Sequence, residues 1–72
     1  MDKNLIESLR TCNQKANYGR GCTSIRIILN YLDRGDFDTA KTIWNLDSDK
    51  VTQYDGMTAI ANKIFGTDFV EN

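Results

Sequence analysis

Residues 24–34 read SIRIILNYLDR, and no other part of the chain constrains the structure so strongly. A helix drawn through this stretch carries apolar side chains nearly all the way round. Such a helix is normally covered on several sides, so we predict a central, buried helix over residues 24–34. Its β-branched isoleucines also permit a strand, but no second strand-like run is present to pair with it. The apolar side chains are Ile25, Ile27, Ile28, Leu29, Tyr31 and Leu32.

Three further helical segments are predicted from apolar residues at helical spacing, with glycines between them. The first covers residues 2–17. The third covers residues 37–46 and follows Gly35, whose neighbour Asp36 is expected to cap it. The fourth begins at Asp47 or Ser48 and ends at Phe65, and Gly56 is expected to kink or split it. Residues 67–72 form a short C-terminal tail, in which Phe69 and Val70 are expected to dock.

The whole chain, residues 1–72, is expected to form one all-α domain. We predict a compact bundle of three to four short helices around the central helix at about 24–34, with a helical hairpin at 24–46. A core of this size supplies only roughly 3–5 kcal/mol of net stability. Self-association is the most available additional source, so a homo-oligomer is one expected state.

One hairpin has a partial counterpart among known repeats. Residues 24–44 resemble a single tetratricopeptide-type unit at Ile27, Tyr31, Gly35, Asp36, Phe37, Asp38, Ala40 and Trp44. The pattern differs at Ile28 and Asp47, where that family has small residues, and at Thr52, where it has a proline. A repeat array also needs about three units. The resemblance therefore implies a helix–turn–helix hairpin and no function.

The composition argues against catalysis. The chain has no histidine, the commonest general base, and only two cysteines, too few for a zinc site of the usual kind. We therefore predict no enzyme activity, no metal and no cofactor. No apolar run approaches the ~18 residues that a membrane span needs, and residues 1–10 lack a signal-peptide pattern. We expect a cytoplasmic protein without membrane contact, in which Cys12 and Cys22 are reduced.

Charge is unevenly distributed along the chain. Residues 1–36 carry six basic and four acidic side chains (+2), and residues 37–72 carry three basic and six acidic ones (−3), which gives the net −1. Arg26, Asn30 and Arg34 recur every fourth residue and form one polar stripe on the second helix, here called the basic stripe. This stripe could follow a phosphate backbone, so a nucleic-acid-associated protein is one alternative. The other interpretation is that the stripe has no binding role and is simply the side of this helix that faces solvent.

The loop at residues 18–24, YGRGCTS, combines glycines, an arginine and hydroxyls at the start of a helix. Free N–H groups at a helix N-terminus attract anions. A second alternative is therefore a small anion or nucleotide binder that uses Tyr18, Arg20, Thr23 and Ser24. The loop lacks the P-loop lysine and does not follow the dinucleotide-binding pattern. A simple helix–helix connection also accounts for it.

The leading hypothesis is a small non-catalytic protein-binding module, a modulator or inhibitor of a larger protein. Aromatic residues are enriched at binding hot spots, and a small core cannot easily bury all of those in this chain. We predict that Trp44, Tyr54, Phe65 and Phe69 bind the partner. The chain is short, lacks proline and is rich in Asn and Asp, which suggests a phage or mobile-element accessory protein.

Overall fold

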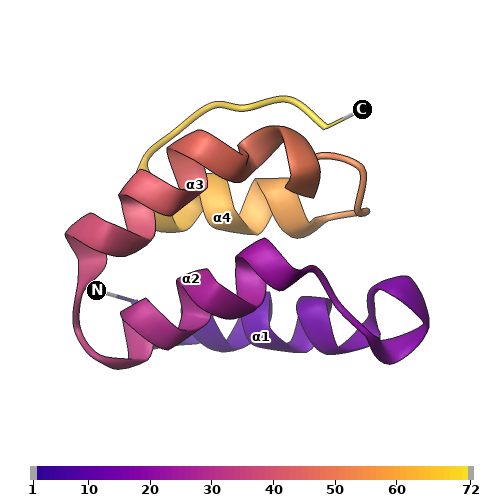
Figure 1. Ribbon diagram of the computed structural model, residues 1–72, viewed down its shortest axis with the longest axis horizontal. Coiled ribbons are helices and arrows are strands. Elements are labelled where there is room, and N and C mark those ends of the chain that lie inside the picture. The colour runs from indigo at the N-terminus through magenta and orange to yellow at the C-terminus, as the bar shows by residue number, and fades with distance from the viewer. Residues whose placement is uncertain (1, 72) are drawn as a thin grey trace.

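The computed structural model describes residues 2–71. Helices joined by turns make up most of this part of the chain, and a non-helical tail follows the last helix (Figure 1). No strand occurs within these residues, and none of their helices is both long and apolar enough to cross a membrane. The predicted all-helical bundle is confirmed. Its elements are α1 (Lys3–Lys15), the 3-10 turn η1 (Asn17–Gly19), α2 (Thr23–Asp33), α3 (Phe37–Val51) and α4 (Met57–Phe65).

The four helices form two layers. In the view of Figure 1, α2 and α3 lie in front and α1 and α4 behind them. The most extensive helix–helix contact joins α2 to α3, and α4 packs against α1 and α3. The predicted helical hairpin at 24–46 is therefore confirmed as α2 and α3, with Gly35 in the left-handed turn between them (φ 77°).

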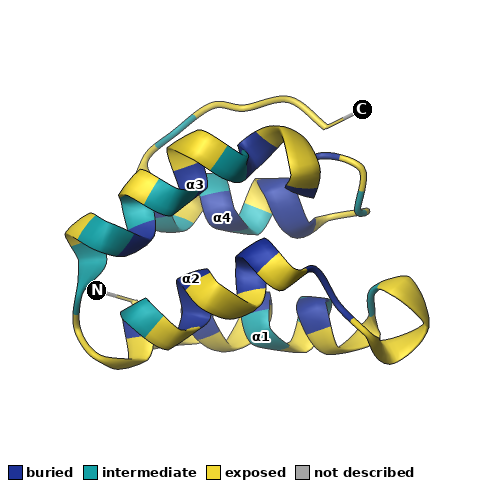
Figure 2. Cartoon of the chain, in the orientation of Figure 1, coloured by how far each residue is buried: buried dark blue, intermediate teal, exposed yellow. Residues whose placement is uncertain are grey.

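All four helices contribute buried residues to the core, coloured dark blue in Figure 2. Helix α2 contributes five buried residues, more than any other helix, as its apolar sequence predicted. Burying large apolar side chains supplies most of the free energy that holds such a fold together. The largest fully buried side chains are Trp44, Leu9, Ile25, Ile28, Met57, Val51 and Thr58.

The third helix is longer than predicted. It continues to Val51 and does not stop at Leu46, so Asp47 and Ser48 lie inside α3 and do not cap a fourth helix. Ser48 and Val51 follow Trp44 at helical spacing, and all three are buried. Because these residues extend one buried face, ending the helix at 46 would have exposed Val51. The capping interpretation of the two polar residues was wrong.

The break before α4 occurs at Gly56. This glycine is the N-cap of α4 and has a left-handed backbone (φ 78°), which L side chains rarely adopt. The prediction that Gly56 would split the last segment is therefore correct, and the first part of that segment belongs to α3.

The tail after α4 crosses the outside of α3 and α4 (Figure 1). The ring of Phe69 meets that of Trp44 edge-on, with centroids 5.4 Å apart. Val70 is 81% exposed, so the expectation that it docks was wrong. In extended chain, successive side chains point to opposite sides, and Phe69 occupies the inward position.

Candidate functional site

The four aromatic residues predicted to bind a partner do not form a single exposed patch. Trp44 and Phe65 lie in the core with their rings stacked at 6.2 Å. Tyr54 is half-buried against the core, and Phe69 lies at its rim over Trp44. The indole N–H of Trp44 donates to Thr67 Oγ1 at 2.8 Å, so its polar atom is satisfied inside the fold.

Two exposed apolar side chains lie on the α2–α3 hairpin, apart from Tyr18 in the loop before α2 and Phe69 and Val70 in the tail. Leu46 of α3 is 73% exposed and Ile27 of α2 is 41% exposed. Tyr31 and Ile43 are partly buried and pack against the core. We call these four residues the hairpin face. Leu46 follows Trp44 by two positions and so falls off the buried stripe of α3, which is the signal in the sequence that could have identified it.

A hydrogen bond between α2 and α3 marks where the two helices meet, and helical spacing from it shows which residues flank the contact. Ser24 Oγ donates to Asp47 Oδ2 at 2.9 Å. Ile27 lies three residues after Ser24 and therefore shares its side of α2, while Ile43 lies four residues before Asp47 and shares its side of α3. Ser24 is buried and Ile27 is exposed. The hairpin face thus borders the solvent side of the α2–α3 contact.

The basic stripe lies next to this face. Arg26, Asn30 and Arg34 are all exposed. Arg26 Nη2 donates to the carbonyl of Arg20 at 2.7 Å, and the guanidinium of Arg34 lies 5.3 Å from the ring centroid of Tyr31. Within residues 2–71, neither Arg26 nor Arg34 forms an ion pair with a carboxylate. The stripe therefore presents positive charge that no neighbouring side chain neutralises at contact distance.

Arg10 shows the opposite arrangement on α1. Its guanidinium lies 2.7 Å from an oxygen of Asp33 and 3.3 Å from one of Glu7. Arg10 donates hydrogen bonds to the carboxylates of Asp33 and Glu7, and these bonds raise the pKa of Arg10. Its charge is thus balanced within the chain, in contrast to the charges of Arg26 and Arg34 on α2.

The loop before α2 has an unusual backbone. Asn17 and Tyr18 have φ of 52° and 57°, and Gly19 and Gly21 are also left-handed. The carbonyl of Ala16 accepts hydrogen bonds from both of these glycine N–H groups at 3.0 Å. The loop holds Tyr18 fully exposed at its tip. Left-handed backbone at consecutive non-glycine residues is costly, so local contacts must hold this conformation.

Asn13 supplies the main contact, and sequence reasoning missed it. The residue is buried in α1, and its Oδ1 accepts the backbone N–H of Cys22 at 2.7 Å. A Cβ on Gly21 would lie 2.8 Å from two atoms of Asn13, so only glycine fits there. Asn13 follows Leu9 by four positions on the buried stripe of α1, and a polar residue on such a stripe was the available signal.

The four residues predicted for an anion site are placed differently from one another. Tyr18, Arg20 and Thr23 are exposed, whereas Ser24 is buried and its hydroxyl is bonded to Asp47. The carboxylate of Asp47 therefore lies at the N-terminal turn of α2 and supplies negative charge there. An incoming anion would meet this charge, which weakens the case for a phosphate at Ser24.

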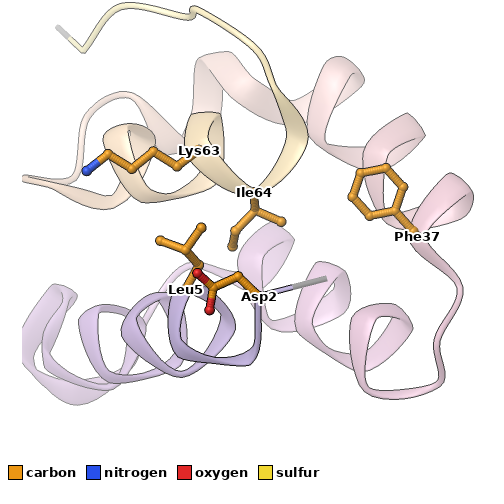
Figure 3. A pocket seen from close by; sticks show the side chains of 5 residues that line it. All are labelled: Asp2, Leu5, Phe37, Lys63 and Ile64. Atoms are coloured by element: carbon orange, nitrogen blue, oxygen red, sulfur yellow. The ribbon is translucent and has the colours of Figure 1, made fainter.

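A cavity of about 380 Å³ opens between the start of α1, the start of α3 and the end of α4 (Figure 3). Leu5 and Ile64 point toward one another across it, and the ammonium of Lys63 points away from the carboxylate of Asp2. Leu5, Ile64 and Phe37 make the cavity mainly apolar. Because its two charged groups do not converge, the cavity offers no paired acid and base.

Comparison with protein-family models, with curated proteins and with solved structures found no match for this chain. The tetratricopeptide resemblance of residues 24–44 is therefore a likeness of one hairpin only. The surface geometry of α2 and α3 remains the basis for a functional argument.

Proposed function

We propose that the chain is a small non-catalytic protein-binding module, which modulates or inhibits a larger protein through the hairpin face. The observation that supports this is the exposure of Leu46 (73%) on α3 and of Ile27 (41%) on α2, a helix whose Arg26 and Arg34 form no ion pair within residues 2–71. Apolar surface rimmed by polar groups is typical of interaction sites. Tyrosine and arginine are also enriched among hot-spot residues, and Tyr31 and Arg34 lie together here.

Site-specific photo-crosslinking in a lysate of the source cells tests this proposal. A photoreactive amino acid replaces Leu46 in one variant and Ala59 in a control. Ala59 is exposed on α4, which packs against α1 and α3 and not against α2. We expect position 46 to crosslink to one discrete protein, and nuclease treatment should leave this adduct intact. The adduct should be absent when the photoreactive residue is at position 59. Equal labelling at both positions, or no adduct at 46, would contradict the proposal.

A nucleic-acid-associated protein is the second candidate, because the basic stripe is exposed and free of ion pairs. Electrostatic binding to phosphates weakens steeply with salt. A gel shift at low salt would then depend on Arg26 and Arg34 and not on Leu46. Replacing both arginines by alanine should reduce the salt slope by about 2. A complex that Leu46→Ser abolishes would favour the protein-binding module instead.

A further inference from the structure

We infer that the element that binds the hairpin face is an amphipathic α-helix with an acidic flank, supplied by a partner protein. The inference rests on the proposed function and specifies the partner. It follows from three properties of the surface: the hydrogen bonding of its backbone, the spacing of its apolar side chains and the location of its unpaired arginines.

The backbone of the surface favours a helical partner. Both α2 and α3 use their backbone groups within their own helices. The face therefore offers no strand edge to which an extended peptide could add. A partner segment that is buried there must satisfy its own N–H and C=O groups, and a helix does so.

The apolar side chains fit such a helix. Ile27 and Tyr31 are four residues apart on α2, and Ile43 and Leu46 are three residues apart on α3. They form two short apolar rows on either side of the α2–α3 contact. A helix of the partner laid along this contact would place its apolar residues, at positions i, i+3 or i+4, and i+7, between the two rows, as in helix-in-groove recognition.

The charge is asymmetric across this surface. On the α2 side, Arg26 and Arg34 have no carboxylate partner within residues 2–71. On the α3 side, Lys50 Nζ lies 3.6 Å from Asp47 Oδ1 and is thereby balanced. Complementary charges steer association and fix the orientation of partners. Carboxylates along the edge of the partner helix that faces α2 would complement the arginines.

Two synthetic helical peptides of about 16 residues, or about 24 Å of helix, test the inference. Both carry leucines at helical spacing, and their flanking residues are all Glu in one and all Lys in the other. Amide chemical shifts of the isotope-labelled protein are followed during titration. We expect the Glu peptide to move the amides of Ile27, Tyr31, Ile43 and Leu46 and to bind at least about tenfold more tightly than the Lys peptide, or about 1.4 kcal/mol.

Variants of the protein separate the two contributions. Arg26→Gln with Arg34→Gln should weaken the Glu peptide about tenfold and remove the preference over the Lys peptide. Leu46→Ser should weaken both peptides. Lys3→Gln with Lys63→Gln is the matched control, because it removes two exposed positive charges away from the hairpin face. This control should leave both affinities unchanged.

The outcomes are distinct. Equal binding of both peptides, or tighter binding of the Lys peptide at the same amides, would overturn the acidic partner and leave the proposed function standing. No movement of these amides with either peptide at millimolar concentration would overturn both. Sedimentation of the free protein is the last check. A dimer that Leu46→Ser converts to monomer would overturn the inference, because a second copy would then cover the face.

Discussion

Asn62 of α4 holds the C-terminal tail at Phe69 by two hydrogen bonds. Asn62 Nδ2 donates to the carbonyl of Phe69 at 2.7 Å, and the backbone N–H of Phe69 donates to Asn62 Oδ1 at 3.2 Å. The same Oδ1 accepts the hydroxyl of Thr67 at 2.8 Å, and that hydroxyl accepts the indole N–H of Trp44. One asparagine thus joins the tail to the central tryptophan.

Replacing Asn62 by alanine should release the tail. Three hydrogen bonds of about 0.5–1.5 kcal/mol each are removed, and partial compensation by water leaves an expected loss of about 2 kcal/mol in the free energy of unfolding. Water would then reach Trp44, so its fluorescence should shift to longer wavelength. Lys63→Ala, at the exposed neighbouring position, is the control. An unchanged emission maximum in Asn62→Ala would show that the tail does not shield the tryptophan.

Gly21 and Gly35 have similar backbones and different surroundings. Their φ values are 71° and 77°, but only Gly21 has Asn13 at 2.8 Å from an added Cβ. Gly35→Ala should cost about 1 kcal/mol of stability through backbone strain alone. Gly21→Ala should cost at least about 1 kcal/mol more, because Asn13 must move and loosen its bond to Cys22. Urea denaturation compares the two, and equal losses would rule out a tight contact at Gly21.

The exposed side chain of Tyr18 does not offset the strain of its left-handed backbone. Its φ is 57° and its side chain is fully exposed. Asparagine tolerates the left-handed region better than tyrosine does, so Tyr18→Asn should raise the free energy of unfolding by about 0.5 kcal/mol. Tyr18→Phe keeps the strain and should leave stability unchanged. If Tyr18→Asn destabilised the protein, the ring would have to make a stabilising contact.

Local patterns were sufficient to predict most of the fold from the sequence. The apolar run at 24–34 predicted α2, and Gly35 with Asp36 predicted the turn and the cap of α3, because these signals act between near neighbours. The end of α3 was misjudged, since Asp47 and Ser48 resemble a helix start while long-range burial of Val51 extends the helix past them. Tertiary context overrode the local preference there.

The candidate surface was harder to predict. Trp44 and Phe65 could equally have been core or interface residues, and only the packing of four helices shows that they are buried. The basic stripe followed directly from the spacing of Arg26, Asn30 and Arg34, and all three are exposed. Leu46 was missed because its spacing from Trp44 indicates exposure only once Trp44 is known to be buried, and Trp44 was expected to bind a partner.

Asp36 should make stability depend on pH in acid. Thr39 donates hydrogen bonds to its carboxylate from the side-chain hydroxyl and the backbone N–H, and these lower the pKa of Asp36 in the folded state. The ionised carboxylate therefore contributes its full stabilisation of the fold above the pKa of an unfolded Asp, about 3.9. This stabilisation is lost as pH falls through the lower pKa that Asp36 has in the folded protein. Asp36→Asn should show a shallower loss of stability in this range by urea denaturation. A parallel pH profile would assign the acid dependence to other carboxylates.

The most direct test of the account concerns Leu46, because the hairpin face can serve a partner only if its most exposed side chain does not hold the fold together. The measurement is the free energy of unfolding of Leu46→Ser by urea denaturation. With Leu46 73% exposed, we predict a change within about 0.5 kcal/mol, as for ordinary surface substitutions. A loss of about 2 kcal/mol or more, as at a core position, would contradict the account.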